Sequence, residues 1–202
     1  QSQLTHTIQN HTHSARCNHD DAKMSLGSFF KWSARGEDKW GGPNTVDGNT
    51  HLTYYIWNRD LGELTKEQWD AEIKASFAAW AAVTNLSFEQ LSSPRGADIY
   101  IAASNRKRDE FGEEGGVLAW AFLPDKPEFD GQLWSLFDIA ERWSAGDPSE
   151  DEILLRAVAT HEIGHLLGLD HSEETDALMY PYYNPSVYTP QDNDDIPRIQ
   201  DL

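Results

Sequence analysis

Five residues near the carboxyl end of the chain have the types and spacing of a catalytic metal site. His161 and His165 are four positions apart, so on a helix both imidazoles project from one face. Gly168 can end that helix and turn the chain, which lets His171 return as a third nitrogen ligand. Three protein ligands leave a fourth zinc position for water, and Glu162 is placed to take a proton from that water. The spacing therefore predicts one catalytic zinc and a hydrolytic reaction.

Helices and short strands must position these residues. Helices are expected over residues 66 to about 83, from 147 to about 167, and from 189–192 onward. Thr65 and Gln68 form a capping box at the first helix, Asp147 suits the N-cap of the second, and Pro197 should kink or shorten the third. Strands are expected at residues 52–57, 86–91, 98–102, 117–122 and 133–137, the last as a short edge. This order of elements predicts a mixed α/β domain.

The segment around the zinc ligands also resembles a known family. Residues 161–171 have the HExxHxxGxxH pattern, which together with a later methionine such as Met179 marks the metzincin peptidases. Ser172, directly after the third histidine, is similar to the matrixin branch, the matrix metalloproteinases. Other matrixin-like segments are Lys31-Trp32, Leu52-Thr53-Tyr54, Ala97-Asp98-Ile99, residues 115–119, Asp194-Asp195-Ile196 and Ile199-Gln200. The resemblance covers essentially all of the chain after Phe29. It implies a metzincin-like catalytic domain with a twisted five-stranded mixed sheet, three helices and an active-site cleft.

The resemblance implies a substrate site beside the zinc. The strand at residues 117–122 resembles the upper rim of the family's cleft, where an extended peptide pairs with the strand. One pocket beside the zinc would then set the preference for an apolar side chain after the scissile bond. The residues expected to bind substrate are Leu118, Ala119, Val158, Pro181 and Tyr183, with Tyr182 in the same wall segment; Leu118 and Val158 could equally be ordinary core residues.

The family's other metal sites are only partly retained. The positions of its second, structural zinc carry residues that cannot replace three histidines and an aspartate, namely Asn105, Lys107, Trp120 and Leu136. We therefore expect one zinc per chain. A calcium site keeps Asp138 and Glu141, while its loop position is Gly112, with Glu113 and Glu114 nearby. The alternative is that these acids are simply solvated.

The only cysteine, Cys17, lies in a polar segment over residues 1–28 that we interpret as an inhibitory prosegment preceding a catalytic domain over 29–202. In Ala15-Arg16-Cys17-Asn18-His19-Asp20-Asp21, three residues match the matrixin PRCGVPD-like motif, whose thiolate binds the zinc and keeps the enzyme latent. Two alternatives stay open. Cys17 is a bystander, or it forms a separate metal cluster with His11, His13 and His19.

The amino-acid composition limits the classes of binding partner that we expect for this chain. The 202 residues include 34 acidic and 16 basic side chains, and the resulting formal charge of −18 argues against nucleic-acid and anionic-membrane binding. No apolar run is long enough to cross a bilayer, and no signal peptide is visible in the sequence. We expect a secreted, monomeric zinc endopeptidase that acts on proteins or peptides. The alternatives are a zinc-binding interaction module without turnover and a peptidase of another metzincin branch.

Overall fold

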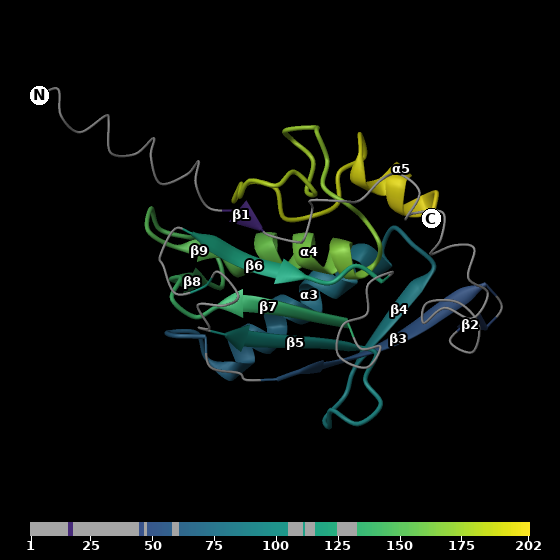
Figure 1. Ribbon diagram of the computed structural model, residues 1–202, viewed down its shortest axis with the longest axis horizontal. Helices are drawn as coiled ribbons and strands as arrows, with labels where there is room; N and C mark the ends of the chain where they lie inside the picture. The colour runs from purple at the N-terminus through teal and green to yellow at the C-terminus, as the bar shows by residue number, and fades with distance from the viewer. Residues whose placement is uncertain are drawn as a thin grey trace, which may run out of the picture.

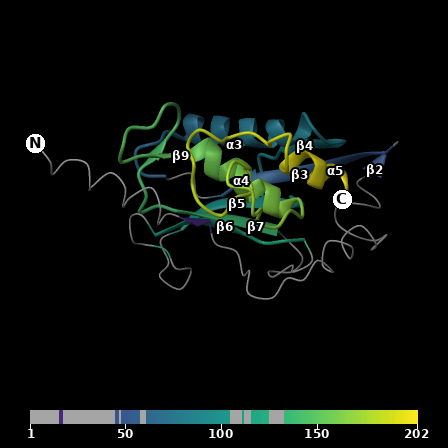
Figure 2. The ribbon, with the colours of Figure 1, turned by 90° about the horizontal axis from the view of Figure 1, so that it is seen from above.

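The computed structural model describes residues 16–17, 45–46, 48–57, 61–104, 111, 116–124 and 133–202. The described residues form a mixed sheet with two long helices packed on one of its faces (Figures 1 and 2). Its five longer strands are β3 (Asn49–Ile56), β4 (Leu86–Gln90), β5 (Ile99–Ser104), β6 (Val117–Ala121) and β7 (Leu133–Asp138). The predicted α/β class, with a five-stranded mixed sheet and three helices, is confirmed. The predicted boundary between residues 28 and 29 lies outside the described residues.

The order of the longer strands is β4-β3-β5-β7-β6, and only β6 runs antiparallel to its neighbour. The two-residue strands β1 (Arg16–Cys17) and β2 (Thr45–Val46) pair with β6 and β3 respectively. The prediction of an edge strand at residues 133–137 is wrong, because β7 lies between β5 and β6. Its alternate residues Leu133, Ser135 and Phe137 are buried. Strand order depends on contacts between distant segments, which a local pattern does not report.

Helix α3 (Lys66–Ala81) begins where the capping box predicts. The Gln68 backbone N–H donates to the Thr65 hydroxyl, and the Thr65 N–H donates to the Gln68 side chain. Apolar residues at helical spacing then bury one face of α3 against the sheet, and Trp69, Ile73, Phe77 and Trp80 are at most 1% exposed. The aromatic rings of Tyr54 on β3 and Phe77 stack with centroids 4.2 Å apart. This packing supplies a rigid layer against which the next helix can lie.

Helix α4 (Leu155–Leu166) is shorter than predicted, because it begins at Leu155 and not after Asp147. Glu152 accepts hydrogen bonds from the backbone N–H and the hydroxyl of Ser149, each 2.8 Å long, and so closes a local turn instead of a helical one. The following strand β9 (Ile153–Leu154) pairs with β8 (Trp143–Ser144). Acidic capping residues were present at the predicted start, but the strand pairing delays the helix by two turns.

Helix α5 (Asp195–Gln200) also begins later than predicted. Residues 191–194 form a turn in which the Asp194 N–H donates to the Gln191 carbonyl, 3.4 Å away. Pro197 then falls in the first helical turn, where its missing N–H costs no helical bond. The Gln200 side-chain amide donates to the Val83 carbonyl at 2.9 Å, which ties α5 to the chain that follows α3. None of the helices among the described residues is long and apolar enough to span a membrane.

Candidate metal centre

Two of the predicted zinc ligands lie on buried turns of α4. His161 is 4% exposed and His165 is fully buried, and their Nε2 atoms are 3.1 Å apart. The Nδ1 atom of His161 donates to the Leu178 carbonyl, and Nδ1 of His165 donates to the Leu169 carbonyl, each at 2.7 Å. Because a carbonyl only accepts, each Nδ1 carries a proton, and in the neutral form of each ring the lone pair is then on Nε2. Two such lone pairs facing each other fit a cation between them, and the carbonyls fix the ring orientations, as outer partners of metal ligands do.

The third histidine arrives through the end of α4. Gly168 has a φ of 113°, a left-handed backbone conformation that residues other than glycine rarely adopt. The Leu169 N–H donates to the Gly164 carbonyl and the Gly168 N–H to the His165 carbonyl, which closes the helix end. The chain then turns back so that His171 joins the pair, and ligand atoms of all three histidines lie within 4.8 Å of one another. Within the described part of the chain, no other group of three such side chains is gathered in this way.

The residues behind the ligands hold α4 in place. Met179 is fully buried and packs directly against Gly164, where an added Cβ would lie 2.4 Å from its sulfur. The same Cβ would lie 2.9 Å from the Trp80 ring. The Trp80 indole N–H donates to the Thr160 carbonyl at 2.8 Å, so α3 is hydrogen-bonded to α4 at the residue before His161. Glu162, on the same turn, is completely buried.

A buried carboxylate on α5 supports the segment that follows the ligands. Asp195 accepts hydrogen bonds from the backbone N–H groups of Leu178 at 2.7 Å and Met179 at 3.0 Å. It also accepts from the Gln191 N–H at 2.9 Å. Burial raises the pKa of Asp195, although these three hydrogen bonds act in the opposite direction. The Leu178 carbonyl accepts a hydrogen bond from His161, so Asp195 helps to fix the orientation of the His161 ring through the Leu178 backbone. The sequence placed Asp195 in a family-like segment, but assigned it no role.

A pocket opens beside His161. Its lining is mostly apolar and aromatic, and consists of Ala157, Val158, His161, Ala177, Leu178, Tyr180, Tyr182, Tyr183, Asn184 and Val187. The predicted substrate residues Val158 and Tyr183 are among them. The predicted residues Leu118 and Ala119 are buried within β6, and Pro181 is half-buried outside the lining. Sequence reasoning missed Ala157, which precedes His161 by four residues and therefore shares its helix face.

The other predicted metal positions are only partly described. Asp138 ends β7, is fully buried, and its side chain accepts from the Ala140 N–H at 2.8 Å. Glu141 is 4% exposed. Trp120 on β6 and Leu136 on β7, two positions of the family's structural zinc, face each other across the strands. The remaining positions predicted for these two sites lie outside the described residues, namely Asn105, Lys107, Gly112, Glu113 and Glu114.

Strand β1 joins two residues of the predicted prosegment to the sheet. Arg16 pairs with Val117 and Cys17 with Ala119, in parallel with β6. The other residues of the predicted cysteine cluster, His11, His13 and His19, lie outside the described residues.

Comparison with known proteins agrees with this geometry. The matrixin family model matches residues 45–202. Karilysin from Tannerella forsythia is 39% identical over 176 residues, covering 80% of this chain and 36% of that protein. Interstitial collagenase from Sus scrofa is 40% identical over 155 residues, covering 75% and 31%. Stromelysin-1 from Equus caballus is 35% identical over 196 residues, covering 94% and 37%. The chain thus spans about a third of the length of each of these relatives, and it belongs to the matrixin family of zinc metalloendopeptidases.

Proposed function

We propose that this chain is a zinc-dependent endopeptidase in which Glu162 is the general base. The observation that carries the proposal is the convergence of His161, His165 and His171, with two of the rings oriented by backbone carbonyls. Zinc held by these rings would polarise the scissile carbonyl and lower the pKa of a bound water to about 7. Glu162 adjoins the first ligand and is fully buried. Its carboxylate would take the proton from the water and deliver it to the leaving amine.

The substrate would lie along β6 with one side chain in the pocket beside His161. Among the described residues, β6 pairs with β7 along one edge and with the two residues of β1 along the other, and the rest of that second edge could accept an added strand. The Tyr183 hydroxyl accepts a hydrogen bond from the Leu154 N–H at 2.7 Å, which holds its ring in the pocket wall. An apolar residue after the scissile bond fits this lining, whereas a charged one would lose its hydration without a paired charge.

Latency through Cys17 is the regulatory part of the proposal. Its support is the pairing of β1 with β6, since Arg16 and Cys17 then occupy the strand edge that a peptide substrate would use. A prosegment over residues 1–28 that lies on this edge would exclude substrate, and a thiolate from Cys17 would occupy the open zinc position. The rival roles for Cys17 are a bystander residue and a separate cluster with His11, His13 and His19.

Peptide cleavage by matched variants tests the mechanism. Measured in the Cys17→Ala background, where the proposed latch is absent, Glu162→Gln should lower kcat/KM by about 10²–10⁴-fold while zinc content stays at one per chain. Glu173→Gln is the matched control, because Glu173 is an exposed acid two residues after His171, and it should leave cleavage unchanged. Near-full turnover by Glu162→Gln would refute its assignment as the base. If the chain binds zinc but neither it nor Cys17→Ala cleaves any peptide in a mixed library, the interaction-module alternative is favoured.

The same library tests the latch. Cys17→Ala should cleave peptides that the intact chain does not cleave. Equal cleavage by both would refute the latch but would still support the endopeptidase activity.

A buried calcium at Asp138 and Glu141 is a separate part of the proposal, supported by the burial of both carboxylates. Asp138→Asn should abolish any rise in Tm on adding calcium. Secretion and a monomeric state complete the proposal, and sedimentation tests the latter.

A further inference from the structure

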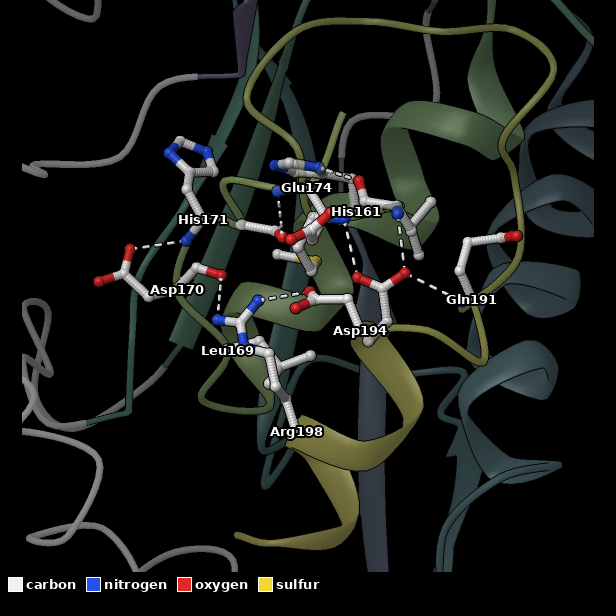
Figure 3. Close-up of polar contacts among 12 residues, drawn as sticks. His161, Leu169, Asp170, His171, Glu174, Gln191, Asp194 and Arg198 are labelled. Carbon is white, nitrogen blue, oxygen red and sulfur yellow. Dashed lines mark hydrogen bonds and ion pairs between the residues drawn. The ribbon is translucent and has the colours of Figure 1, made fainter. Parts of the chain in front are cut away.

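One guanidinium on α5 joins that helix to the loop of the third histidine. The Arg198 Nη2 donates to the carbonyl of Asp170 at 2.9 Å, and its Nη1 pairs with the Asp194 carboxylate at 3.0 Å (Figure 3). Asp170 immediately precedes His171, and its own carboxylate accepts the His171 backbone N–H at 2.7 Å. The Arg198 side chain is 27% exposed, so both contacts are partly shielded from water. Arg198 therefore holds the backbone at the residue before a zinc ligand.

The opposite side of His171 is held by the same helix through another route. The Ser172 N–H donates to the Met179 carbonyl at 2.9 Å, and the Met179 N–H donates to Asp195 on α5. Residues 170 and 172 are thus both anchored to α5, one directly and one through Met179. His171 itself lies in neither a helix nor a strand, so hydrogen bonds of this kind must replace the ladder that positions His161 and His165.

We propose that Arg198 is a positioning residue for metal binding. By holding the Asp170 carbonyl, it fixes the backbone that aims the His171 imidazole at the other two ligands, and Asp194 orients the guanidinium for that contact. A ligand held in its binding geometry loses less conformational entropy when the metal binds. Loss of an outer partner of a metal ligand typically costs 10–100-fold in affinity. This inference rests on the proposed zinc site.

Zinc affinity of the full chain, measured by competition with a chromogenic chelator, tests the proposal. Arg198→Met keeps much of the apolar stem and removes the donors, and it should weaken zinc binding by about 10-fold. Arg198→Lys keeps one charged donor group without the planar fork, and it should recover part of the affinity. Arg142→Met is the matched control. It removes an arginine side chain that is 50% exposed and whose guanidinium lies 3.8 Å from the Asp151 carboxylate. It should leave zinc affinity unchanged.

A spectroscopic readout separates positioning from general destabilisation. In the Co²⁺-substituted protein, the d–d absorption band should change in Arg198→Met toward that of His171→Ala, and Arg142→Met should keep the wild-type band. An unchanged band and affinity in Arg198→Met would overturn the positioning role while leaving the zinc site intact. Equal affinity losses in Arg198→Met and Arg142→Met would also overturn it, because both would then report global stability. If the wild-type chain binds no zinc, the site itself fails, and the proposal fails with it.

Discussion

The ion pair between α3 and α4 leads to a quantitative prediction about the stability of the helix that carries two of the predicted zinc ligands. The Arg156 Nε and Nη2 atoms donate to the two carboxylate oxygens of Glu72 at 2.8 and 2.9 Å. The Glu72 side chain is 10% exposed, and that of Arg156 is 38% exposed. Arg156 lies in the first turn of α4, five residues before His161. Breaking the pair should therefore loosen the start of the helix that carries the ligands.

The exposure of the two side chains sets the expected magnitude. Exposed ion pairs contribute about 0–1 kcal/mol, whereas removing one partner of a fully buried pair costs about 3–5 kcal/mol. The Glu72 side chain is largely buried, but the Arg156 side chain is more than a third exposed, so water screens part of the interaction. Two charge-assisted hydrogen bonds in a bidentate geometry then give an expected coupling energy of about 1–3 kcal/mol.

A double-mutant cycle measures this coupling. The variants are Glu72→Gln, Arg156→Met and their combination, compared by urea unfolding at one fixed free zinc concentration, because bound metal adds to apparent stability. A parallel cycle on Arg142 and Asp151 is the control, since this pair is separated by 3.8 Å with side chains 50% and 77% exposed. Its coupling should stay below about 0.5 kcal/mol. Equal coupling energies in the two cycles would refute the reasoning from burial and geometry.

Three further predictions concern packing, pH and metal removal. Gly164→Ala gains about 1 kcal/mol in helix propensity, but its Cβ would clash with the buried Met179 and Trp80 side chains. We therefore expect urea unfolding to show a net destabilisation of about 1–2 kcal/mol, and a more stable variant would contradict this. Burial raises the pKa of Tyr54 from 10.0 to about 12, so its contribution to stability is complete below pH 10 and is lost as the pH rises towards 12. Relative to Tyr54→Phe, the wild type should lose about 2 kcal/mol over that range, and parallel pH curves would disprove the assignment. Zinc at 100-fold its Kd should add about 2.7 kcal/mol of stability that chelation removes, and His171→Ala should abolish most of this gain; an undiminished gain would exclude His171 as a ligand.

Features that depend on neighbouring residues could be predicted from the sequence. The capping box of Thr65 and Gln68 joins residues three apart, and the structure confirms both of its hydrogen bonds. The spacing of His161 and His165 likewise needs only helical geometry, and Gly168 adopts the left-handed conformation that ends the helix. In each case the interacting groups lie within a turn or two of one another, so local backbone geometry brings them together whatever the rest of the fold does.

Features that depend on distant segments were predicted wrongly or not at all. Good capping residues near Asp147 predicted a helix that the pairing of β9 with β8 delays to Leu155. The position of β7 inside the sheet follows from contacts with β5 and β6 that no local pattern contains.

The contacts that hold the zinc ligands show the same division. Arg198 reaches a carbonyl 28 residues earlier, and Arg156 reaches a carboxylate 84 residues earlier. The sequence by itself was enough to predict the three histidines that could bind the metal, because the prediction needs only their types and local spacing. Only the tertiary structure decided what holds them in place, because α3, α4 and α5 meet through packing between segments that are far apart along the chain.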